Sequence, residues 1–498
     1  MPKHQEQIPL LSLMSENKSF YITTTLPYVN AEPHIGFAME LIRADVIARW
    51  KKLNGFDVFF NTGTDEHGLK IYKKAEEEGM DVRKFVDKHS EKFKNLIDLL
   101  DIDKNIYFIR TTDEKHIKAA QEFWSRCKAN GDIEKKIYKT KYCVGCELEK
   151  TDSELVNGKC PIHPNLNIEV REEENYFFKF SRYQGKLLDL YKSYPEFVIP
   201  NSRFNEIKSF VEMGIKDFSI SRLKEKMPWG VPVPGDSVHV MFVWFDALVS
   251  YISALGWPSD EENFKRFWVE GTPTQYAGKD NLRQQSAMWQ AMLMSAGLPN
   301  SHQIVINGFI NSNGQKMSKS LGNVISPAEM VKRYGVDGTR YLLLRHVNSF
   351  EDTDVTWERL DEWYEANLAN GLGNLVSRVM KMAETHLTSP VSKTVFDIDK
   401  EVGKALDKFE IQKGINHIWH KIAELDLYIQ ETEPFKLVKE DAVRAVELIQ
   451  NQVLKLASIA QALTPFMPET AEKILKAIQE NRIAGPLFPR KDSSTSSL

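Results

Sequence analysis

The sequence predicts an α/β protein: a parallel sheet split by an insertion and followed by a helical bundle. Three observations support this prediction. Short apolar runs alternate with helical periodicity over residues 19–113 and again over 236–312, the order typical of βαβ units. The segment 114–235 between them differs, because it holds all the CxxC-type pairs. From about residue 361 onward the apolar period is helical, with short polar connections.

The first half begins with the run SFYITTTLPYVN, whose aromatic and β-branched residues predict a strand from Phe20. Residues 36–54 then place Ile42, Val46, Ile47, Trp50 and Leu53 at helical spacing, and Gly55 ends the helix. The run DVFFNTGTDEHG predicts a second strand and a loop. A strand, loop, helix and strand in this order favour a parallel sheet.

After the charge-rich stretch EVREEEN and the Gly/Pro-rich exit PWGVPVPGD, strand-like runs resume. They are HVMFVWFDALV, TQYAGKD and HQIVINGFI, and each leads into a loop or a helix. Three helical stripes follow in the last third, and they predict an antiparallel bundle. Their members are Leu368, Leu372, Leu375 and Val379; Ile411, Ile415, Ile418, Ile422, Leu425 and Ile429; and Val446, Ile449, Val453 and Leu456.

Composition is that of an ordinary globular chain. The 498 residues suggest three or four domains, with 42% hydrophobic and 27% charged residues. The net charge of −4 gives no global polycation, although it says nothing of a local basic face. No run approaches the roughly 18 apolar residues of a membrane span, so no membrane association is expected. Four cysteines make no disulfide scaffold, and a cytoplasmic location is expected.

Two ligand pairs lie 13 residues apart in the insertion: Cys143-Val-Gly-Cys146 and Cys160-Pro-Ile-His163. A two-residue gap lets both members of a pair reach one ion, and thiolate and imidazole groups are the ligands that zinc prefers. We therefore predict one structural zinc knuckle with a closed four-ligand shell. The alternative is coincidence in a surface loop. Cys127 has no partner at ligand spacing and is expected to pack on a helix.

Two further signatures suit a polyphosphate. His34-Ile-Gly36-Phe37 stands where a loop enters a helix, and a glycine there lets an anion approach the helix N-terminus. The loop NSNGQKMSKSLGNVISP carries Lys316 and Lys319 among small polar residues, so it can close over charge. Either alone is weak evidence, because short HIG matches and solvated basic turns are common.

Together, in this order, the two signatures resemble those of class I aminoacyl-tRNA synthetases, whose catalytic domain is Rossmann-like. More narrowly, the chain is similar over nearly its whole length to the bacterial-type methionyl-tRNA synthetase family with a single zinc knuckle. The stretches that carry the resemblance are TTTLPYVNAEPHIGFA, NTGTDEHGLKI, CVGC and CPIH, FVWFDALVSY, YAGKD, NGFINSNGQKMSKSLGN, ANGLGNLVSR and GPLFPR.

The resemblance implies a two-step reaction in which L-methionine attacks the α-phosphate of ATP and is then transferred to the 3′ end of initiator and elongator tRNA-Met. The attacking carboxylate is already ionised, so alignment and charge stabilisation are what the site must supply, with Mg²⁺ accompanying ATP. The implied catalytic residues are His34 and Lys319. The implied ATP-binding residues are Pro33, His34, Gly36, Phe37, Lys316, Lys319 and Ser320.

The resemblance also implies methionine-binding residues, namely Leu26, Tyr28, Asp65, Trp244, Tyr251, Asp280 and Trp289. An aromatic, polarizable pocket suits a thioether, and Asp65 matches the carboxylate that holds the α-ammonium. From composition alone, both tryptophans would more readily be core residues. Two departures stand out. Gln284 and Gln285 replace an aromatic residue and a histidine, and Phe37 replaces a histidine that would donate a hydrogen bond to phosphate.

The helical third resembles the anticodon-binding bundle of the family. Asn374, Arg378 and Phe435 match its anticodon readers, and unpaired RNA bases are read by such polar and stacking side chains. Phe435 stands where the family has a tryptophan, so weaker but retained recognition is expected; the alternative for it is a core position. No appended barrel follows, so a monomer is expected. Trp419, on the apolar stripe, is expected in the core.

Two functions other than methionine–tRNA ligation are compatible with parts of the sequence. A catalytically degenerate paralogue that binds RNA or nucleotide is suggested by the Phe37, Gln284 and Gln285 departures, and opposed by the otherwise intact motifs. Ligation of another amino acid by a class I relative is disfavoured, because an insertion of about 120 residues is too short for an editing domain.

The sequence predicts seven segments in chain order. They are an N-terminal leader 1–18, a first catalytic half 19–113, the insertion 114–235, a second catalytic half 236–312, the KMSKS and stem-contact region 313–360, the anticodon-binding bundle 361–486 and a tail 487–498.

Overall fold

The computed structural model describes residues 18–490 apart from 144–147, 151–154, 162–163, 313, 318–322, 392–398 and 484. At its centre lies a six-stranded sheet with the order β3-β2-β1-β12-β13-β7, in which every neighbouring pair is parallel. The strands are β1 (Ser19–Thr23), β2 (Asp57–Thr64), β3 (Tyr107–Arg110), β7 (Val198–Ile199), β12 (Thr272–Gly278) and β13 (Gln303–Asn307). The predicted α/β fold with a parallel sheet is confirmed. Strand order reverses between β1 and β12, where open parallel sheets place their ligands.

Alternate side chains of the strands enter two different hydrophobic cores. On β1, Phe20 and Ile22 join one core while Tyr21 joins the other. On β12, Tyr276 and Ala277 divide in the same way. This period of two is that of a strand buried on both faces, so the central strands lie between two layers of helices.

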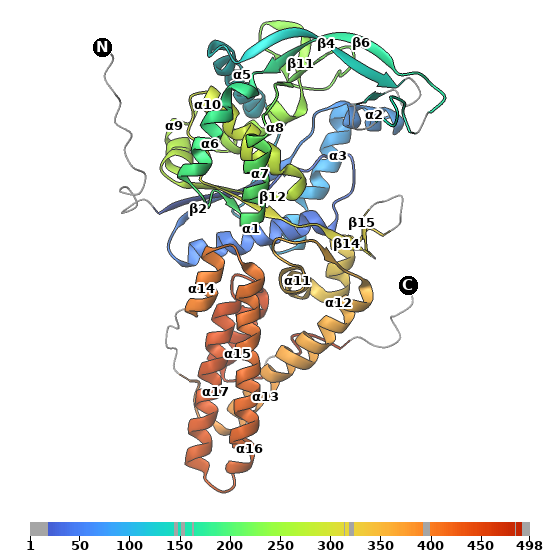
Figure 1. Ribbon diagram of the computed structural model, residues 1–498. Coiled ribbons are helices and arrows are strands. Elements are labelled where there is room, and N and C mark those ends of the chain that lie inside the picture. The colour runs from blue at the N-terminus through green and yellow to red at the C-terminus, as the bar shows by residue number, and fades with distance from the viewer. Residues whose placement is uncertain are drawn as a thin grey trace, which may run out of the picture.

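Helix α1 (Ile35–Leu53) covers one face of the sheet and is itself enclosed (Figure 1). It packs against the sheet, against α11 (Pro327–Arg345) and against α14 (Lys400–Asp407). Burial extends to its polar residues Glu40, Arg43 and Asp45, so α1 has no solvent-facing stripe over most of its length. The predicted helix 36–54 is confirmed, and Gly55 follows it with φ of 77°.

The segment 114–235 shares its core with the second catalytic half. Its α5 (Glu114–Ala129) packs on α8 (Val243–Ser253), and its β7 joins the edge of the main sheet. A long antiparallel ribbon of β4 (Ile133–Cys143) and β6 (Glu169–Phe178) extends from this body. The remaining elements of the segment are β5 (Leu148–Lys150), α6 (Gln184–Ser193), α7 (Asn201–Glu212), β8 (Phe218–Ser219), β9 (Ser221–Leu223) and β10 (Pro232–Val233).

The prediction of a strand over HVMFVWFDALV is wrong beyond Met241. Strand β11 (Asp236–Met241) ends there, and residues 243–253 form α8. Nearly every described side chain of α8 is buried, so its sequence shows neither the helical period of 3.6 residues nor the strand period of two. Moreover, β11 pairs with β9 and β10 in a small antiparallel sheet outside the central one.

The predicted helical bundle is also confirmed, and its helices run away from the sheet (Figure 1). All members of the first two predicted stripes are buried, while Val446 of the third is only partly buried. The helices are α12 (Trp357–Tyr364), α13 (Asn374–His386), α14, α15 (Ile411–Thr432), α16 (Pro434–Leu437), α17 (Ala442–Leu463) and α18 (Pro468–Glu480), with a π-helix at Glu365–Gly373.

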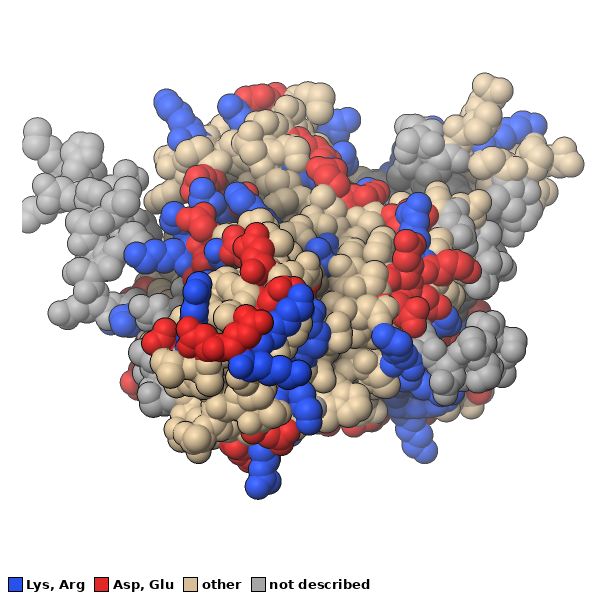
Figure 2. All heavy atoms as spheres, turned by 90° about the horizontal axis from the view of Figure 1, so that it is seen from below, with Lys and Arg blue, Asp and Glu red and all other residues tan. Residues whose placement is uncertain are grey.

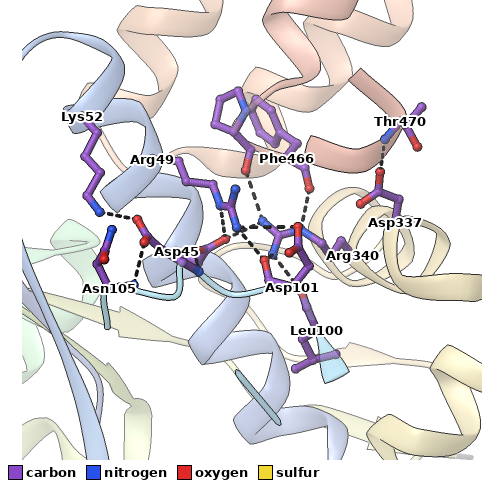
Figure 3. Close-up of polar contacts among 12 residues, drawn as sticks. Asp45, Arg49, Lys52, Leu100, Asp101, Asn105, Asp337, Arg340, Phe466 and Thr470 are labelled. Atoms are coloured by element: carbon purple, nitrogen blue, oxygen red, sulfur yellow. Dashed lines mark hydrogen bonds and ion pairs between the residues drawn. The ribbon is translucent and has the colours of Figure 1, made fainter. Parts of the chain in front are cut away.

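A fully buried arginine joins the bundle to the part of the chain that contains the six-stranded sheet (Figure 3). Arg340 on α11 pairs with Asp45 on α1 at 2.7 Å and donates to the Phe466 carbonyl at 2.8 Å. It also donates to the Leu100 carbonyl at 3.2 Å. Asp45 is likewise fully buried and takes a second partner, Arg49, at 2.8 Å. One guanidinium therefore ties together α1, the loop after α4 (Leu96–Leu99) and the turn between α17 and α18. Among the described residues, no helix is both long and apolar enough for a bilayer.

Candidate active site

Two adjoining cavities open where the strand order reverses. The first has a volume of about 240 Å³ and is formed by the loops after β1, β12 and β13 and by the start of α1. The second, of about 70 Å³, lies between the loop after β1 and α8. Thr25 and Asn281 line both cavities, so the two cavities share a wall.

The first cavity is built around the N-terminus of α1. His34 is the N-cap, and its Nδ1 accepts a hydrogen bond from the Gly36 amide at 3.1 Å. A Cβ on Gly36 would lie 2.9 Å from the imidazole, so only glycine lets the ring fold over the backbone. Both residues line the cavity, and an anion is favoured at this helix end.

Phe37 lines the same cavity, and its ring meets Phe93 edge-on at 5.5 Å between centroids. It supplies packing and no hydrogen bond. Pro33 precedes the cap and does not line the cavity. Backbone pairing places Lys316 on β15 (Gln315–Lys316) opposite Asn311 of β14 (Ile310–Ser312), and the neighbouring Met317 lines the cavity. Lys319 and Ser320 lie outside the described residues, as does the Lys316 side chain.

Five of the predicted methionine-binding residues line the second cavity, and two do not. Those that line it are Leu26, Tyr28, Asp65, Trp244 and Tyr251. Asp280 lines the first cavity instead. Trp289 is fully buried behind Tyr251, edge-on to it at 6.1 Å and stacked on Phe123 at 5.5 Å. Gln284 and Gln285 also line the second cavity.

Asp65 is the carboxylate of the second cavity, and its surroundings disfavour its charge. Burial, followed by the neighbouring Asp246, raises the pKa of Asp65 well above its usual range. His67 links the two carboxylates: its amide lies 3.4 Å from Asp65 Oδ1 and its Nδ1 lies 2.8 Å from Asp246 Oδ2. A buried pair of this kind is a place where a ligand cation gains charge stabilisation.

The sequence reasoning missed two buried polar residues of the first cavity. Glu40 accepts hydrogen bonds from the Thr25 amide at 2.8 Å and the Thr25 hydroxyl at 2.5 Å, and burial raises its pKa to about 7. Asn307 accepts from Arg43 at 2.9 Å. Asp246 was missed as well. The signal that could have identified Glu40 and Asp246 was a charged residue inside an otherwise apolar run. Burying a charge costs free energy unless hydrogen bonds or an ion pair compensate it.

The bundle holds the predicted anticodon residues on two helices. Asn374 and Arg378 lie on α13, one turn apart, and Arg378 pairs with Asp426 of α15 at 2.6 Å. Phe435 on the short α16 is half exposed, so it is not a core residue. Trp419 is buried at 8% exposure, as expected for the core. Seen from below, Lys and Arg alternate with Asp and Glu over this face rather than forming one basic field (Figure 2).

Two of the predicted zinc ligands lie within the described residues. Cys143 ends β4 and Cys160 follows a tight turn at Val156–Lys159, and both are buried. Cys146 and His163 lie outside the described residues, so the four-ligand set is not defined there. No cluster of three or more metal-ligating side chains occurs among the residues described. Cys127 is buried on α5, as predicted.

The sheet order, the HIG cap and the KMSKS run after β14 define the class I aminoacyl-tRNA synthetases. Comparison with known proteins narrows the class. The profile described as tRNA synthetases class I (M) matches residues 20–167 and 151–380. The profile described as the anticodon binding domain of methionyl tRNA ligase matches residues 379–494. The chain belongs to the methionyl-tRNA synthetase family.

Individual relatives agree with this assignment. The chain is 41% identical to a methionine–tRNA ligase of Thermotoga maritima, over 92% of this chain and 75% of that one. It is 40% identical to the enzyme of Brucella suis, over 93% and 92% of the two chains. Among solved structures, Mycobacterium tuberculosis methionyl-tRNA synthetase in complex with methionyl-adenylate matches with a TM-score of 0.84 and 34% identity, covering 95% of this chain and 99% of that one.

Proposed function

We propose that the chain is a methionine–tRNA ligase, which activates L-methionine with ATP and esterifies tRNA-Met, both initiator and elongator. The observation that carries the proposal is the pair of adjoining cavities. One is capped by His34 and Gly36 at a helix N-terminus, and the other joins aromatic walls to one buried carboxylate, Asp65. A triphosphate fits the first and a zwitterion with an apolar side chain fits the second.

Activation joins the two ligands at the shared wall. A carboxylate oxygen of methionine attacks the α-phosphorus of ATP, and the bond from that phosphorus to the bridging oxygen breaks, so diphosphate leaves. No proton needs to be removed from the nucleophile, and the site acts by alignment and charge stabilisation. We assign His34 to the phosphates and Asp280 to the ribose side, with Lys319 and Lys316 on the triphosphate. Mg²⁺ enters with ATP and shields its phosphate charge.

Transfer uses the same cavity. A hydroxyl of the 3′-terminal ribose of the tRNA attacks the methionyl carbonyl, its proton is lost to the medium or the leaving phosphate, and AMP departs. We assign Asn374, Arg378 and Phe435 to the anticodon. Phe435 supports this role because its exposed ring offers a stacking surface, and base–aromatic stacking is worth about 1–3 kcal/mol per base.

We further propose that Cys143, Cys146, Cys160 and His163 hold one structural zinc ion. Burial of both described cysteines in the stretch from the end of β4 to the start of β6 supports this, since thiolates are the ligands that a soft cation favours. The ion would fix the tip of the β4–β6 ribbon and take no part in the chemistry. We also propose that the chain acts as a monomer in the cytoplasm.

The test is ATP–diphosphate exchange with each of the twenty amino acids in turn. Exchange that depends on methionine is expected, and its absence would refute the proposal and favour a degenerate, RNA-binding paralogue. Asp65→Asn should raise the KM for methionine by about tenfold or more, because it removes a buried charge from the ammonium, while the KM for ATP changes little. The exposed Asp189→Asn serves as the matched control and should leave both unchanged.

A further inference from the structure

A second fully buried arginine, Arg43, lies on α1. Its two terminal nitrogens donate four hydrogen bonds. One goes to Asn307 Oδ1 at 2.9 Å. The other three go to consecutive backbone carbonyls, those of Val347 at 2.9 Å, Asn348 at 2.8 Å and Ser349 at 3.1 Å. Arg43 thus joins three segments that lie far apart in the sequence.

The acceptors of Arg43 are all uncharged, being one side-chain amide and three backbone carbonyls. Burial lowers the pKa of Arg43 to about 10, so its side chain is charged at neutral pH. A buried charge costs free energy unless hydrogen bonds compensate it, and each lost acceptor leaves a donor unsatisfied. The guanidinium therefore resists any displacement of Asn307 or of the loop that carries the three carbonyls.

Asn307 belongs to a wall of the first cavity. Residues 307–310 form this wall, and the start of α1 forms another. Asn307 itself is 1% exposed and stands at the end of β13. Because Arg43 extends from α1 to Asn307, it ties one wall to the other. The separation of these two walls sets the width of the space that is left for a ligand.

The loop that Arg43 binds supports the same wall. A Cβ on Gly308 would lie 2.3 Å from the Glu351 backbone, so the loop and the wall are in direct contact. The Phe309 amide donates to Asp352 Oδ1 at 3.0 Å. Directly after the loop, β16 (Thr353–Asp354) pairs in parallel with β14. A shift of the loop would therefore move the wall of the first cavity with it.

We infer that Arg43 is a positioning residue for the nucleotide, which holds the wall formed by residues 307–310 at a fixed distance from α1. The inference rests on the proposed function, because it takes ATP as the ligand of the first cavity. Arg43 does not line that cavity, so it acts through Asn307 and the loop rather than by contact with ATP. Activation requires the α-phosphorus to be aligned with the methionine carboxylate, and a displaced wall misaligns it.

The test measures the two cavities separately in Arg43→Met, which keeps most of the length of the side chain but removes its charge and its donors. In ATP–diphosphate exchange, kcat/KM for ATP should fall by about tenfold or more, since a misplacement of about 1 Å can cost about a hundredfold. The Kd for methionine, measured by calorimetry without ATP, should stay unchanged, because the second cavity does not include this wall. A general packing defect would weaken both ligands.

Arg340→Met is the matched control, because Arg340 is equally buried and lines neither cavity. Both variants are assayed at a temperature at which circular dichroism shows them folded. The control should leave kcat/KM for ATP unchanged. A loss of equal size in the two variants would mean that the removal of any buried arginine has this effect, and it would overturn the inference.

A conservative variant keeps the inference testable if Arg43→Met does not fold. Arg43→Lys keeps the charge but has a single nitrogen, which cannot bind Asn307 and all three carbonyls together. Its kcat/KM for ATP should lie between those of the native chain and of Arg43→Met. A native value in Arg43→Lys would mean that the charge alone suffices, and it would overturn the positioning role.

The outcomes separate the two proposals. An unchanged kcat/KM for ATP in Arg43→Met overturns the positioning role and leaves the proposed function standing. Absence of methionine-dependent exchange in the native chain overturns the proposed function itself. The Kd for ATP, measured by calorimetry without methionine, then still decides the positioning role, because Arg43→Met should bind ATP more weakly than the native chain does.

Discussion

Phe37 is the residue at which this site departs most from a phosphate-binding design. It lines the first cavity and packs on Phe93, but its side chain cannot donate a hydrogen bond. One lost transition-state donor typically costs about 10²–10³ in rate. Phe37→His should therefore raise the rate of methionine-dependent ATP–diphosphate exchange by at least about tenfold.

The same substitution should lower the melting temperature slightly, because the edge-to-face contact with Phe93 is weakened. Phe93→Leu is a useful companion, since it disturbs that contact without adding a donor, and it should not raise the rate. An exchange rate unchanged by Phe37→His would mean that another group, such as Thr25 or Asn281 on the shared wall, already stabilises the phosphates.

His116 makes the stability of the folded chain depend on pH. It is fully buried, with Nδ1 2.9 Å from the Ser253 hydroxyl, and burial lowers its pKa from 6.5 to about 3. As pH falls below 6.5 the unfolded chain takes up a proton that the folded chain does not, so stability is lost between pH 6.5 and 3. At pH 5 the loss from this one group is about 2 kcal/mol.

Melting temperatures measured at pH 7 and pH 5 test whether stability falls as the pH is lowered. His116→Gln should show a smaller fall in melting temperature than the native chain. His420→Gln, at an exposed histidine of α15, should show the same fall as the native chain. Equal falls in the native chain and in His116→Gln would contradict the assignment.

At the scale of elements, the sequence predicted what is local and missed what depends on the fold. β1, α1 and the bundle helices could be predicted from the sequence, because their apolar residues recur at the spacing of a strand or of a helix. α8 has apolar residues on all sides and gave no period. β7 has only two residues and belongs to the central sheet only through its pairing with β13.

The same limit applies to the site. His34 and Gly36 were predicted from one short run, because cap and helix are contiguous. Asp246 lies 179 residues from His67, and Asn307 lies 264 from Arg43, so their contacts exist only once the sheet has formed. Trp289 was predicted from an aromatic match, but it packs on Tyr251 and is not among the residues that line the cavity.

The β4–β6 ribbon is the element that should depend on zinc. Its base packs into the core through Phe178, whereas its tip carries Cys143. Chelation should therefore speed amide exchange near the tip and leave α15 and α17 unchanged. Cys160→Ala should lose the metal, and Cys127→Ala, at a buried cysteine of α5, should keep it. Purified chain without zinc and with unaltered melting would refute the structural role.

In the molecule as a whole, Arg340 links the helical bundle to the part of the chain that contains the six-stranded sheet. Arg340→Met leaves a buried carboxylate with one partner fewer, and breaking such a pair costs about 3–5 kcal/mol. We expect an earlier midpoint in urea unfolding. Arg333→Met removes a partner of Asp361 whose side chain is 35% exposed, on the same helix, and it should cost about 1 kcal/mol or less.

A double variant sharpens this prediction. Asp45→Leu with Arg340→Met removes both charges, so it should be more stable than Arg340→Met alone. If Arg340→Met unfolds at the same urea concentration as Arg333→Met, the junction is held by the surrounding apolar contacts and not by the buried pair.

We propose that one chain joins methionine activation to recognition of its tRNA. The most direct measurement is aminoacylation of a tRNA-Met transcript with radiolabelled methionine, beside the same transcript with one anticodon base changed. We expect methionyl-tRNA from the first and a loss of roughly 5- to 150-fold in kcat/KM from the second, the range that corresponds to one lost base contact of about 1–3 kcal/mol. Failure to charge the native transcript, or equal charging of both, would contradict the account.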